Sequence, residues 1–420
     1  MMNLRLAGAL TAMSISATAV AGCGAAARPR PAPAVVLTAS QVAALRAYGT
    51  SDTAFGLSVL ASLCASRPAA DTVISPVSLA TGLAMAYLGA RGPTAASIAR
   101  VLHWPAASGS PVAGLRARSA LLRSLDAPAV TFTASNEIWA DPSLTTSRSF
   151  AAAVDSAFQA GLRRVPLLTE PERARQRINA AIAADTRGHI PSLLPTGSLS
   201  RAATGWVLTD ALYLSARWKD PFNHALTVAG SFATPAGPVT ARYLNGDGFA
   251  SAQESGWTAA ALPYRGGRLS MLAVLPPAGG GGGCQLPAAR TLHALATGLG
   301  SNNTATSKTA TAIALPKVRL ASSESLREVL TALGMGLAFS GRADFTGLSP
   351  QACCIGLIQH AATLAVAERG TVATAATAVG VQASAARITL TFDRPYLLVL
   401  QDSLTGEPLM LAWVANPAAS

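Results

Sequence analysis

The sequence from residue 368 to residue 387 reads ERGTVATAATAVGVQASAAR, and its sixteen central residues, 371 to 386, contain no charge and no proline. In a strand, alternate side chains point to opposite faces. Proline would remove a ladder hydrogen bond, and a buried unpaired charge would be costly. We therefore predict that this segment can enter the middle of an existing sheet. One face of the strand would carry only small side chains, those of Thr371, Ala373, Ala375 and Thr377.

The flanks of this segment favour the same interpretation. Gly370 supplies a backbone pivot where unusual dihedral angles cost little. After Arg387, the sequence ITLTFDRPYLLVL from residue 388 to residue 400 is typical of two buried strands. On these residues alone, an Ala/Thr-rich linker in an alanine-rich chain remains the alternative.

The segment and its flanks resemble the serpin family of serine protease inhibitors. The sequence Phe392 to Tyr396, FDRPY, is similar to the family's Phe-x-x-Pro-Phe strand, and residues 409–417 are similar to its C-terminal strand. The residues that match the hinge of the family's reactive loop are Glu368, Gly370, Thr371, Ala373, Ala375, Ala376 and Thr377.

Further matches extend the resemblance from about residue 45 to residue 417. Residues 73–92 resemble the start and body of helix B, 136–139 the strand after helix D, 178–195 helix F and its exit, and 208–222 the central strand. The resemblance implies an α+β serpin fold, with eight or nine helices packed on three β-sheets and an exposed reactive loop over about residues 368–391. The largest sheet is expected to be mostly antiparallel, with a gap between central strands.

The function that the resemblance implies is suicide inhibition of a serine or cysteine protease. The protease cleaves the loop and forms an acyl-enzyme, and the freed loop inserts as a new strand into the main sheet. The family's loop length fits without a gap and places the scissile bond between Ser384 and Ala385. Small residues there suit an elastase-like or subtilisin-like protease, while Arg387 is a competing site for a trypsin-like one. Val372 departs from the family pattern, because inhibitory members commonly carry an acid there.

The residues that control insertion can also be carried over from the resemblance. Ser75, Ser78 and His360 match the polar cluster called the shutter, and Trp218 matches the tryptophan at the breach, where the hinge enters the sheet. Asp210 stands where the family usually has asparagine. If Asp210 is buried beside His360, the two can form an ion pair as the histidine protonates, and sheet opening would then depend on pH.

Half of the 420 residues are hydrophobic, which is enough for a large core.

The N-terminus predicts export. After Arg5 an apolar run leads to Val20-Ala21-Gly22-Cys23, which resembles a bacterial lipobox. We expect a signal peptide over residues 1–22, an Ala/Pro-rich tether over 23–40, and one serpin domain over 41–420. Lipid on Cys23 would hold the chain outside the cytoplasmic membrane, and a plain secretory signal is the alternative.

The remaining cysteines leave several pairings open. An exported chain could join two or all of these residues, although adjacent cysteines rarely bond each other. The thiols could equally be small buried apolar groups. No metal-ligand spacing is present, and we expect neither a metal nor a cofactor. The four residues are Cys64, Cys284, Cys353 and Cys354.

The net charge of +12 raises the question of a polyanionic partner. Two arginine groups stand out as glycosaminoglycan candidates, although we favour ordinary solvated faces for both. No nucleic-acid module is present, and we expect a monomer. The two groups are Arg116, Arg118 and Arg123, and Arg173, Arg175 and Arg177.

Other function classes remain as alternatives. The chain has no Gly-x-Ser-x-Gly elbow and no Ser-x-x-Lys pair, so a hydrolase is disfavoured. A non-inhibitory serpin and a lipid-anchored ligand-binding protein stay open. Protease challenge distinguishes these classes from an inhibitor.

Overall fold

The computed structural model describes residues 38–104, 111–158, 162–199, 205–279, 284–300, 311–371 and 389–418. These residues belong to one compact unit, Ala34–Ser420. The described part contains eight α-helices and fourteen strands, which confirms the expected α+β class. No helix in it is long and apolar enough to cross a membrane.

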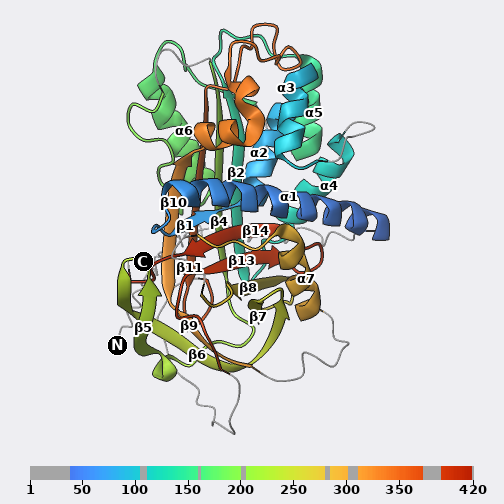
Figure 1. The fold of residues 1–420 in the computed structure, drawn as a ribbon. Coiled ribbons are helices and arrows are strands. Elements are labelled where there is room, and N and C mark those ends of the chain that lie inside the picture. The colour runs from blue at the N-terminus through green and yellow to red at the C-terminus, as the bar shows by residue number, and fades with distance from the viewer. Residues whose placement is uncertain are drawn as a thin grey trace, which may run out of the picture. The chain divides into compact units, whose positions relative to one another are not determined.

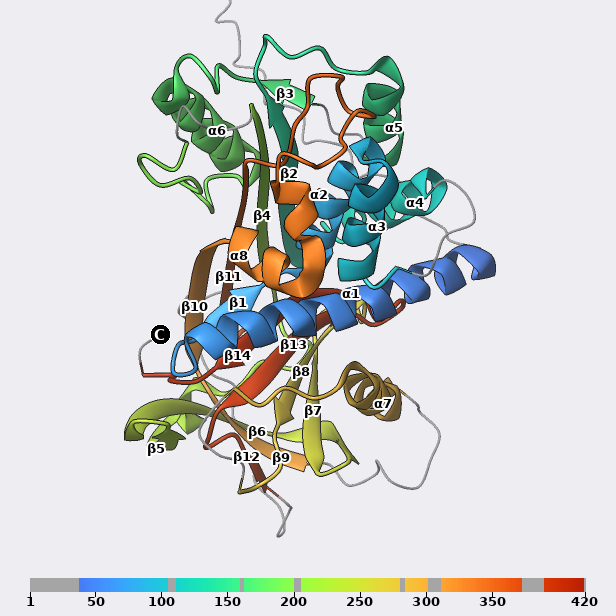
Figure 2. The same ribbon diagram turned by 45° about the horizontal axis from the view of Figure 1, so that its top comes forward.

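The helices are α1 (Ala39–Ser66), α2 (Pro76–Gly89), α3 (Gly92–Val101), α4 (Val112–Arg123), α5 (Arg148–Phe158), α6 (Pro171–Asp185), α7 (Ala289–Gly300) and α8 (Arg327–Leu330). The strands are β1 (Thr72–Ile74), β2 (Val130–Ala140), β3 (Leu162–Arg164), β4 (Trp206–Ala216), β5 (Val228–Thr234), β6 (Gly237–Glu254), β7 (Trp257–Pro263), β8 (Leu269–Leu275), β9 (Thr311–Pro316), β10 (Val318–Ser325), β11 (Leu357–Val366), β12 (Thr389–Thr391), β13 (Tyr396–Asp402) and β14 (Pro408–Val414). Figures 1 and 2 show α1 crossing between α2 on one side and β13 and β14 on the other.

A five-stranded sheet has the order β10-β11-β4-β2-β3. Its two central strands, β11 and β4, run parallel and pair from Leu357 opposite Val207 to Thr363 opposite Tyr213. Their neighbours β10 and β2 are antiparallel to them. A strand that turned back from the end of β11 would therefore run antiparallel to both β11 and β4.

A nine-stranded sheet follows the path β1-β14-β13-β8-β7-β6-β9-β12, with β5 paired to β6. Three separate sheets were expected, but β6 joins two of them. Its first half pairs with β5 and β9, its second half pairs with β7, and the register shifts between Gly246 and Phe249. Such an irregularity bends a strand, so one long strand can serve two layers.

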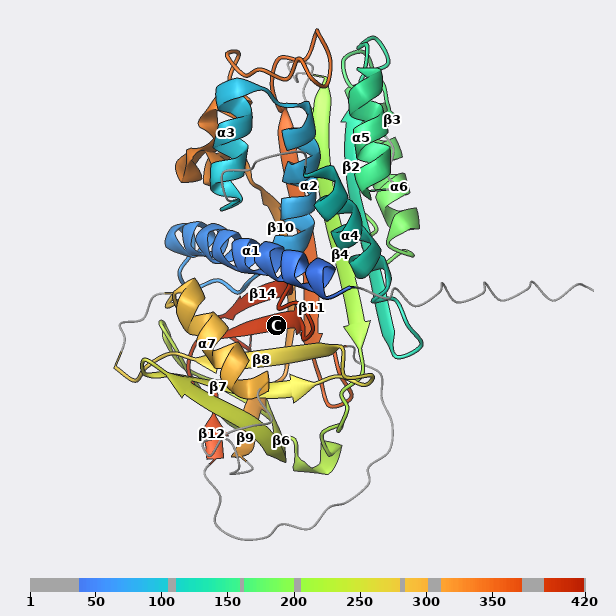
Figure 3. The same cartoon turned by 90° about the vertical axis from the view of Figure 1, so that its right-hand side faces the viewer.

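The two faces of the five-stranded sheet are covered by different helices. Val207 and Ala211 of β4 share a core cluster with Ile178 and Ile182 of α6. Leu208, which points the other way, packs in the core cluster that contains α2. Figure 3 shows α6 and α2 on opposite sides of β4. The predicted start of helix B is confirmed, because the Ser75 side chain caps α2 by accepting from the Ser78 amide.

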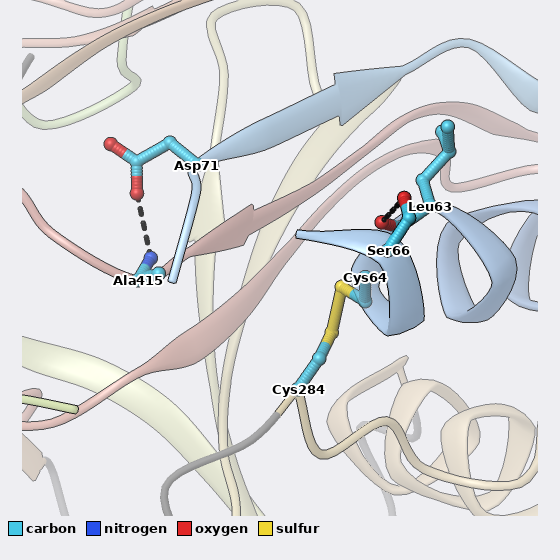
Figure 4. Close-up of a disulfide and its surroundings, with 6 residues drawn as sticks. All are labelled: Leu63, Cys64, Ser66, Asp71, Cys284 and Ala415. Carbon is cyan, nitrogen blue, oxygen red and sulfur yellow. Dashed lines mark hydrogen bonds between the residues drawn. A yellow bond between two sulfur atoms is a disulfide. The ribbon is translucent and has the colours of Figure 1, made fainter. Parts of the chain in front are cut away.

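The disulfide pairing, left open by the sequence, joins Cys64 to Cys284 across 220 residues. It ties the last turn of α1 to the segment before α7 (Figure 4). Nearby, the Asp71 carboxylate accepts the Ala415 amide at 2.7 Å and so fixes the end of β14 (Figure 4). Cys23 and the predicted signal peptide lie outside the described residues, and α1 begins within the last residues of the predicted tether.

Candidate functional site

The predicted reactive loop is described only at its beginning. The scissile bond Ser384-Ala385 and the hinge residues Ala373, Ala375, Ala376 and Thr377 lie outside the described residues. Glu368, Gly370 and Thr371 are described, and their contacts define how the loop leaves β11.

A tight turn reverses the chain immediately after β11. The amide of Ala367 donates to the carbonyl of Gly370 at 3.0 Å, and the Gly370 amide returns a bond to Ala367 at 3.2 Å. Gly370 has φ +151°, and a Cβ there would collide with the carbonyl oxygen of Ala216. This position therefore requires glycine, as the pivot interpretation predicted.

Thr371 lies beside the end of β4 and is hydrogen-bonded to it. Its amide donates to the Ala216 carbonyl at 2.9 Å, and the Ala216 amide donates to the Thr371 hydroxyl at 2.8 Å. The preceding pair, Gly370 and Arg217, forms an antiparallel bridge. Thr371 is only 2% exposed. The last described residues before the predicted insertion stripe thus contact the end of β4 in an antiparallel arrangement.

Trp218 lies beneath this turn and holds it to β4. Its ring nitrogen donates to the Ala367 carbonyl at 2.8 Å, and its amide donates to the Arg369 carbonyl at 2.9 Å. The indole stacks on Tyr264 with ring centroids 4.4 Å apart. Burial raises the pKa of Tyr264 well above its usual value, so the phenol remains neutral. The residue predicted at the breach therefore contacts the turn directly.

The carboxylate of Glu368 is held by three side chains from distant segments. Lys317 donates at 2.9 Å, His224 Nδ1 at 3.0 Å and the Thr227 hydroxyl at 3.1 Å. Partial burial opposes the charged form, but the bonds from Lys317, its own backbone and His224 outweigh it and lower the pKa of Glu368 to about 2. The sequence marked Glu368 but not its partners, because no local pattern links residues so far apart.

The predicted shutter residues meet across the β11–β4 seam. His360 and Asp210 are directly opposite each other, and His360 Nδ1 hydrogen-bonds the Asp210 carboxylate. The Ser75 amide donates to His360 Nε2 at 3.1 Å. An amide can only donate, so Nε2 carries the lone pair and Nδ1 carries the proton that bonds Asp210. Both side chains are buried, as the pH hypothesis required. A proton on Nε2 of His360 would break the hydrogen bond from the Ser75 amide.

Asn136 of β2 completes the row across the sheet. It stands opposite Asp210, and its amide nitrogen donates both to the second carboxylate oxygen of Asp210 and, at 2.9 Å, to the Ser78 hydroxyl. This side chain links the N-terminus of α2 to the seam. The sequence identified Asn136 only as part of a strand motif. The available signal was its polar side chain between Ala134 and Ile138, the apolar residues two positions away on the same face of the strand.

The opposite face of the seam is covered by α6. Ile178 and Ile182 pack on Val207 and Ala211 of β4 and on Ala361 of β11. A strand that entered between β4 and β11 would have to part residues that α6 bridges. Entry of such a strand would therefore require the apolar packing of α6 on the seam to rearrange.

An ionic cluster connects α6 to the edge of the same sheet. Arg163 of β3 contacts Glu137 of β2 at 3.0 Å and Asp185 of α6 at 3.1 Å. Burial is the main cause that raises the pKa of Glu137 to about 7; Arg163 opposes this shift and Asp185 adds to it. One guanidinium thus serves two carboxylates at this contact.

The two arginine groups proposed for polyanions are less available than expected. Arg118 is 1% exposed, bonds the carboxylates of Asp52 and Glu407, and is neither a solvated residue nor an accessible cation. On α6, Arg173 and Arg175 pair with Glu170 and Glu172. The expectation for Arg118 was wrong. Helix periodicity could not show that two acidic residues from distant parts of the chain contact this side chain.

A cavity of about 560 Å³ opens between the breach and α7. Its lining includes Trp218 and Phe222 on one side and Ala296 and Leu299 of α7 on the other. Among the described residues, no group of three His, Cys, Asp or Glu side chains could hold a metal ion.

Comparison with known proteins identifies a family for most of the chain. The family model described as serpin (serine protease inhibitor) matches residues 50–417. An uncharacterised serpin-like protein of Thermococcus kodakarensis is 30% identical over 357 residues, covering 83% of this chain and 81% of its own. The leukocyte elastase inhibitor of Bos taurus is 28% identical, covering 87% and 98%. The structure of the mouse protein-Z dependent protease inhibitor superposes with a TM-score of 0.77 at 19% identity, covering 90% and 99%.

Proposed function

The chain belongs to the serpin family, and we propose that it inhibits a serine protease by cleavage of its loop, trapping of the acyl-enzyme and insertion of the loop between β11 and β4. Family and fold support protease inhibition in general, and serpins are inhibitors rather than catalytic enzymes. The mechanism and the target are the proposed part.

The observation that carries the mechanism is the position of Thr371. This residue is already hydrogen-bonded to Ala216, next to the antiparallel bridge between Gly370 and Arg217, and it follows the turn after β11. Beyond Thr363 and Tyr213, β11 and β4 no longer pair with each other, so an inserting strand would start at the open end of their seam. Insertion is then the extension of a contact that exists before cleavage.

The existing pair also sets the register of the inserted strand. If each further loop residue pairs with the preceding residue of β4, Ala373 meets Leu214, Ala375 meets Leu212 and Thr377 meets Asp210. Residues directly opposite in antiparallel strands share a face. The small side chains of the predicted inward stripe would therefore face the interior with Leu212 and Leu214, where bulk or charge would not fit.

Thr377 would arrive at a polar position, between Asp210 and His360. The Asp210 carboxylate and the His360 imidazole must separate when the strand enters. The Thr377 hydroxyl can donate to the carboxylate and contact the imidazole. Thr377 is the only polar residue of the stripe besides Thr371. Its hydroxyl would thus replace the hydrogen bond between His360 and Asp210 that insertion breaks.

We propose an elastase-like or subtilisin-like target, on the sequence of the loop. The fourteen residues from Thr371 to Ser384 would span about 45 Å as a strand, enough to carry an attached protease along the sheet. Small residues around the Ser384-Ala385 bond suit a narrow specificity pocket. Arg387 offers the alternative cleavage by a trypsin-like protease.

We also propose that the chain is exported and held at the membrane by lipid on Cys23. The Cys64–Cys284 disulfide supports export, because such bonds persist mainly in oxidising compartments. Incorporation of labelled palmitate that is lost in Cys23→Ala would support the anchor. Incorporation that persists in this variant, or no incorporation in the wild type, would overturn it.

A non-inhibitory, ligand-binding role is the second candidate. The cavity of about 560 Å³ beside Trp218 and Phe222 has the size of a small-molecule site. A protein of this kind would bind its ligand and be cleaved by proteases without retaining them.

The two candidates separate on incubation of the full chain with pancreatic elastase, subtilisin and trypsin, followed by denaturing electrophoresis. An inhibitor gives a covalent complex with one protease and releases a C-terminal fragment that begins at Ala385. Clean loop cleavage without any complex would contradict inhibition of these protease classes. A fragment beginning at Ile388 would replace the elastase assignment by a trypsin-like one.

A further inference from the structure

Cys353 and Cys354 bring two thiols together away from the loop and the seam residues described above. Their sulfur atoms are 2.8 Å apart, well inside van der Waals contact. Cys353 is exposed and Cys354 is buried. The pair lies between the short helix Gly336–Phe339 and β11, and its chemistry is independent of protease inhibition.

The backbone on both sides of the pair is fixed by hydrogen bonds. Before it, the Ala352 amide donates to the Ser349 carbonyl at 3.1 Å. After it, Ile355 donates to the Ala338 carbonyl at 3.0 Å, and Gly356 donates to the Trp206 carbonyl at 3.3 Å. The backbone that carries the two adjacent thiols is therefore held in place on both sides.

The surroundings of the two sulfur atoms differ. Cys354 faces an apolar cavity of about 10 Å³, whose lining includes Ile138, Trp206 and Leu208. A space this small and apolar does not hold a stable water, but it leaves room for the sulfur to shift. Burial and the neighbouring Cys353 raise the pKa of the Cys354 thiol to about 12, so the exposed Cys353 is the thiol that reacts first.

We propose that Cys353 and Cys354 form an oxidisable dithiol that closes to a disulfide between adjacent residues by exchange with a disulfide oxidant. The Cys353 thiolate attacks one sulfur of the oxidant and displaces the other as a thiol. Cys354 then loses its proton, attacks the Cys353 sulfur of the mixed disulfide and releases the second thiol. The pair gives up two electrons and two protons, and the oxidant becomes two thiols.

The closed form should be easily reduced. Adjacent Cα atoms are about 3.8 Å apart across a trans peptide, below the spacing that disulfides prefer. The Cys64–Cys284 bond, with a Cα–Cα distance of 5.7 Å, lies within the preferred range. Strained or exposed disulfides are the labile ones. The two bonds of this chain would therefore respond to different reductant levels.

The test is redox equilibration of the folded full chain with reduced and oxidised glutathione over a series of ratios. After acid quenching and digestion, mass spectrometry follows the peptide that contains Cys353 and Cys354. We expect this peptide to become two hydrogens lighter under oxidising ratios, and to revert under reduction that leaves Cys64–Cys284 intact. A peptide that stays a dithiol at every ratio, or that keeps glutathione on Cys353, would overturn the proposal.

Two matched variants assign the steps. Cys354→Ser should accumulate glutathione on Cys353, because no neighbouring thiol releases it. Cys353→Ser should leave the buried Cys354 unmodified in the folded protein. Modification of Cys354 in this variant at the wild-type rate, with an unchanged melting temperature, would contradict entry through Cys353.

Discussion

Thr371 and Ala216 are joined by two hydrogen bonds, from the Thr371 amide to the Ala216 carbonyl at 2.9 Å and from the Ala216 amide to the Thr371 hydroxyl at 2.8 Å. The first residue of the predicted insertion stripe is therefore already hydrogen-bonded to the end of β4. If the loop inserts as proposed, this pair would set both the face and the register of the new strand.

Thr371→Arg is expected to convert the inhibitor into a substrate. The arginine is expected to leave the buried place that Thr371 occupies beside β4, so insertion would have to bury its unpaired charge at a cost of several kcal/mol, which is enough to divert reaction from trapping to turnover by at least about tenfold. The measurement is the number of inhibitor molecules consumed per protease molecule inhibited. Thr371→Ser keeps the hydroxyl and should behave as the wild type.

The fold of the Thr371→Arg variant should survive, since Thr371 belongs to none of the hydrophobic core clusters of the described residues. Circular dichroism and melting would check this. Equal inhibition by the arginine variant and the wild type would count against insertion at this point.

Glu137→Gln is expected to flatten the dependence of melting temperature on pH. Burial first, opposed by Arg163 and assisted by Asp185, raises the pKa of Glu137 from 4.5 in an unfolded chain to about 7 in the fold. The folded state then binds the proton more tightly, so its stability falls as the pH rises from about 4.5 to about 7. The glutamine variant has no ionisable group at this position, so its stability should not fall in this way as the pH rises. Glu170→Gln, an exposed acid at the start of α6, serves as the control and should keep the wild-type profile.

Asp210→Asn is expected to make inhibition less dependent on pH between about 5 and 8, the range in which histidine charge commonly changes. Asparagine still accepts from His360 Nδ1, and Asn136 can turn its amide to suit. The new side chain offers no countercharge to a protonated His360, so the ion pair that would make sheet opening depend on pH cannot form. Inhibition rates and melting curves at several pH values would show this. Identical profiles for variant and wild type would end the hypothesis.

Arg118→Met is expected to destabilise the fold by about 3–5 kcal/mol, the usual effect of leaving a buried charge without its partner. Asp52 and Glu407 both depend on Arg118, and both are fully buried. Arg116→Met, on the exposed side of the same helix, should change stability little. Denaturant unfolding of both variants gives the comparison, and equal stabilities would show that the buried cluster contributes nothing.

The sequence predicted those features that depend on local pattern. Ser75 before proline marks the start of α2, and Gly370 marks a turn that tolerates no side chain. The insertion of the small residues after Gly370 stays a prediction. Each of these is a property of a few consecutive residues, which side-chain period and backbone preference determine.

Features that depend on distant segments could not be predicted. Lys317 and His224 reach Glu368 only because β6, β9 and β11 come together, and Arg118 is buried only because α1 and the turn before β14 bring acids to it. The Cys64–Cys284 pair is of the same kind. Charge and spacing in the sequence carry no information about such contacts until the fold is known.

The most direct measurement is a crystal structure of the chain after proteolytic cleavage at Ser384-Ala385. We predict a sixth strand between β11 and β4, antiparallel to both, with Thr377 between Asp210 and His360. A cleaved chain in which His360 still lies opposite Asp210, with the loop outside the sheet, would contradict inhibition by insertion.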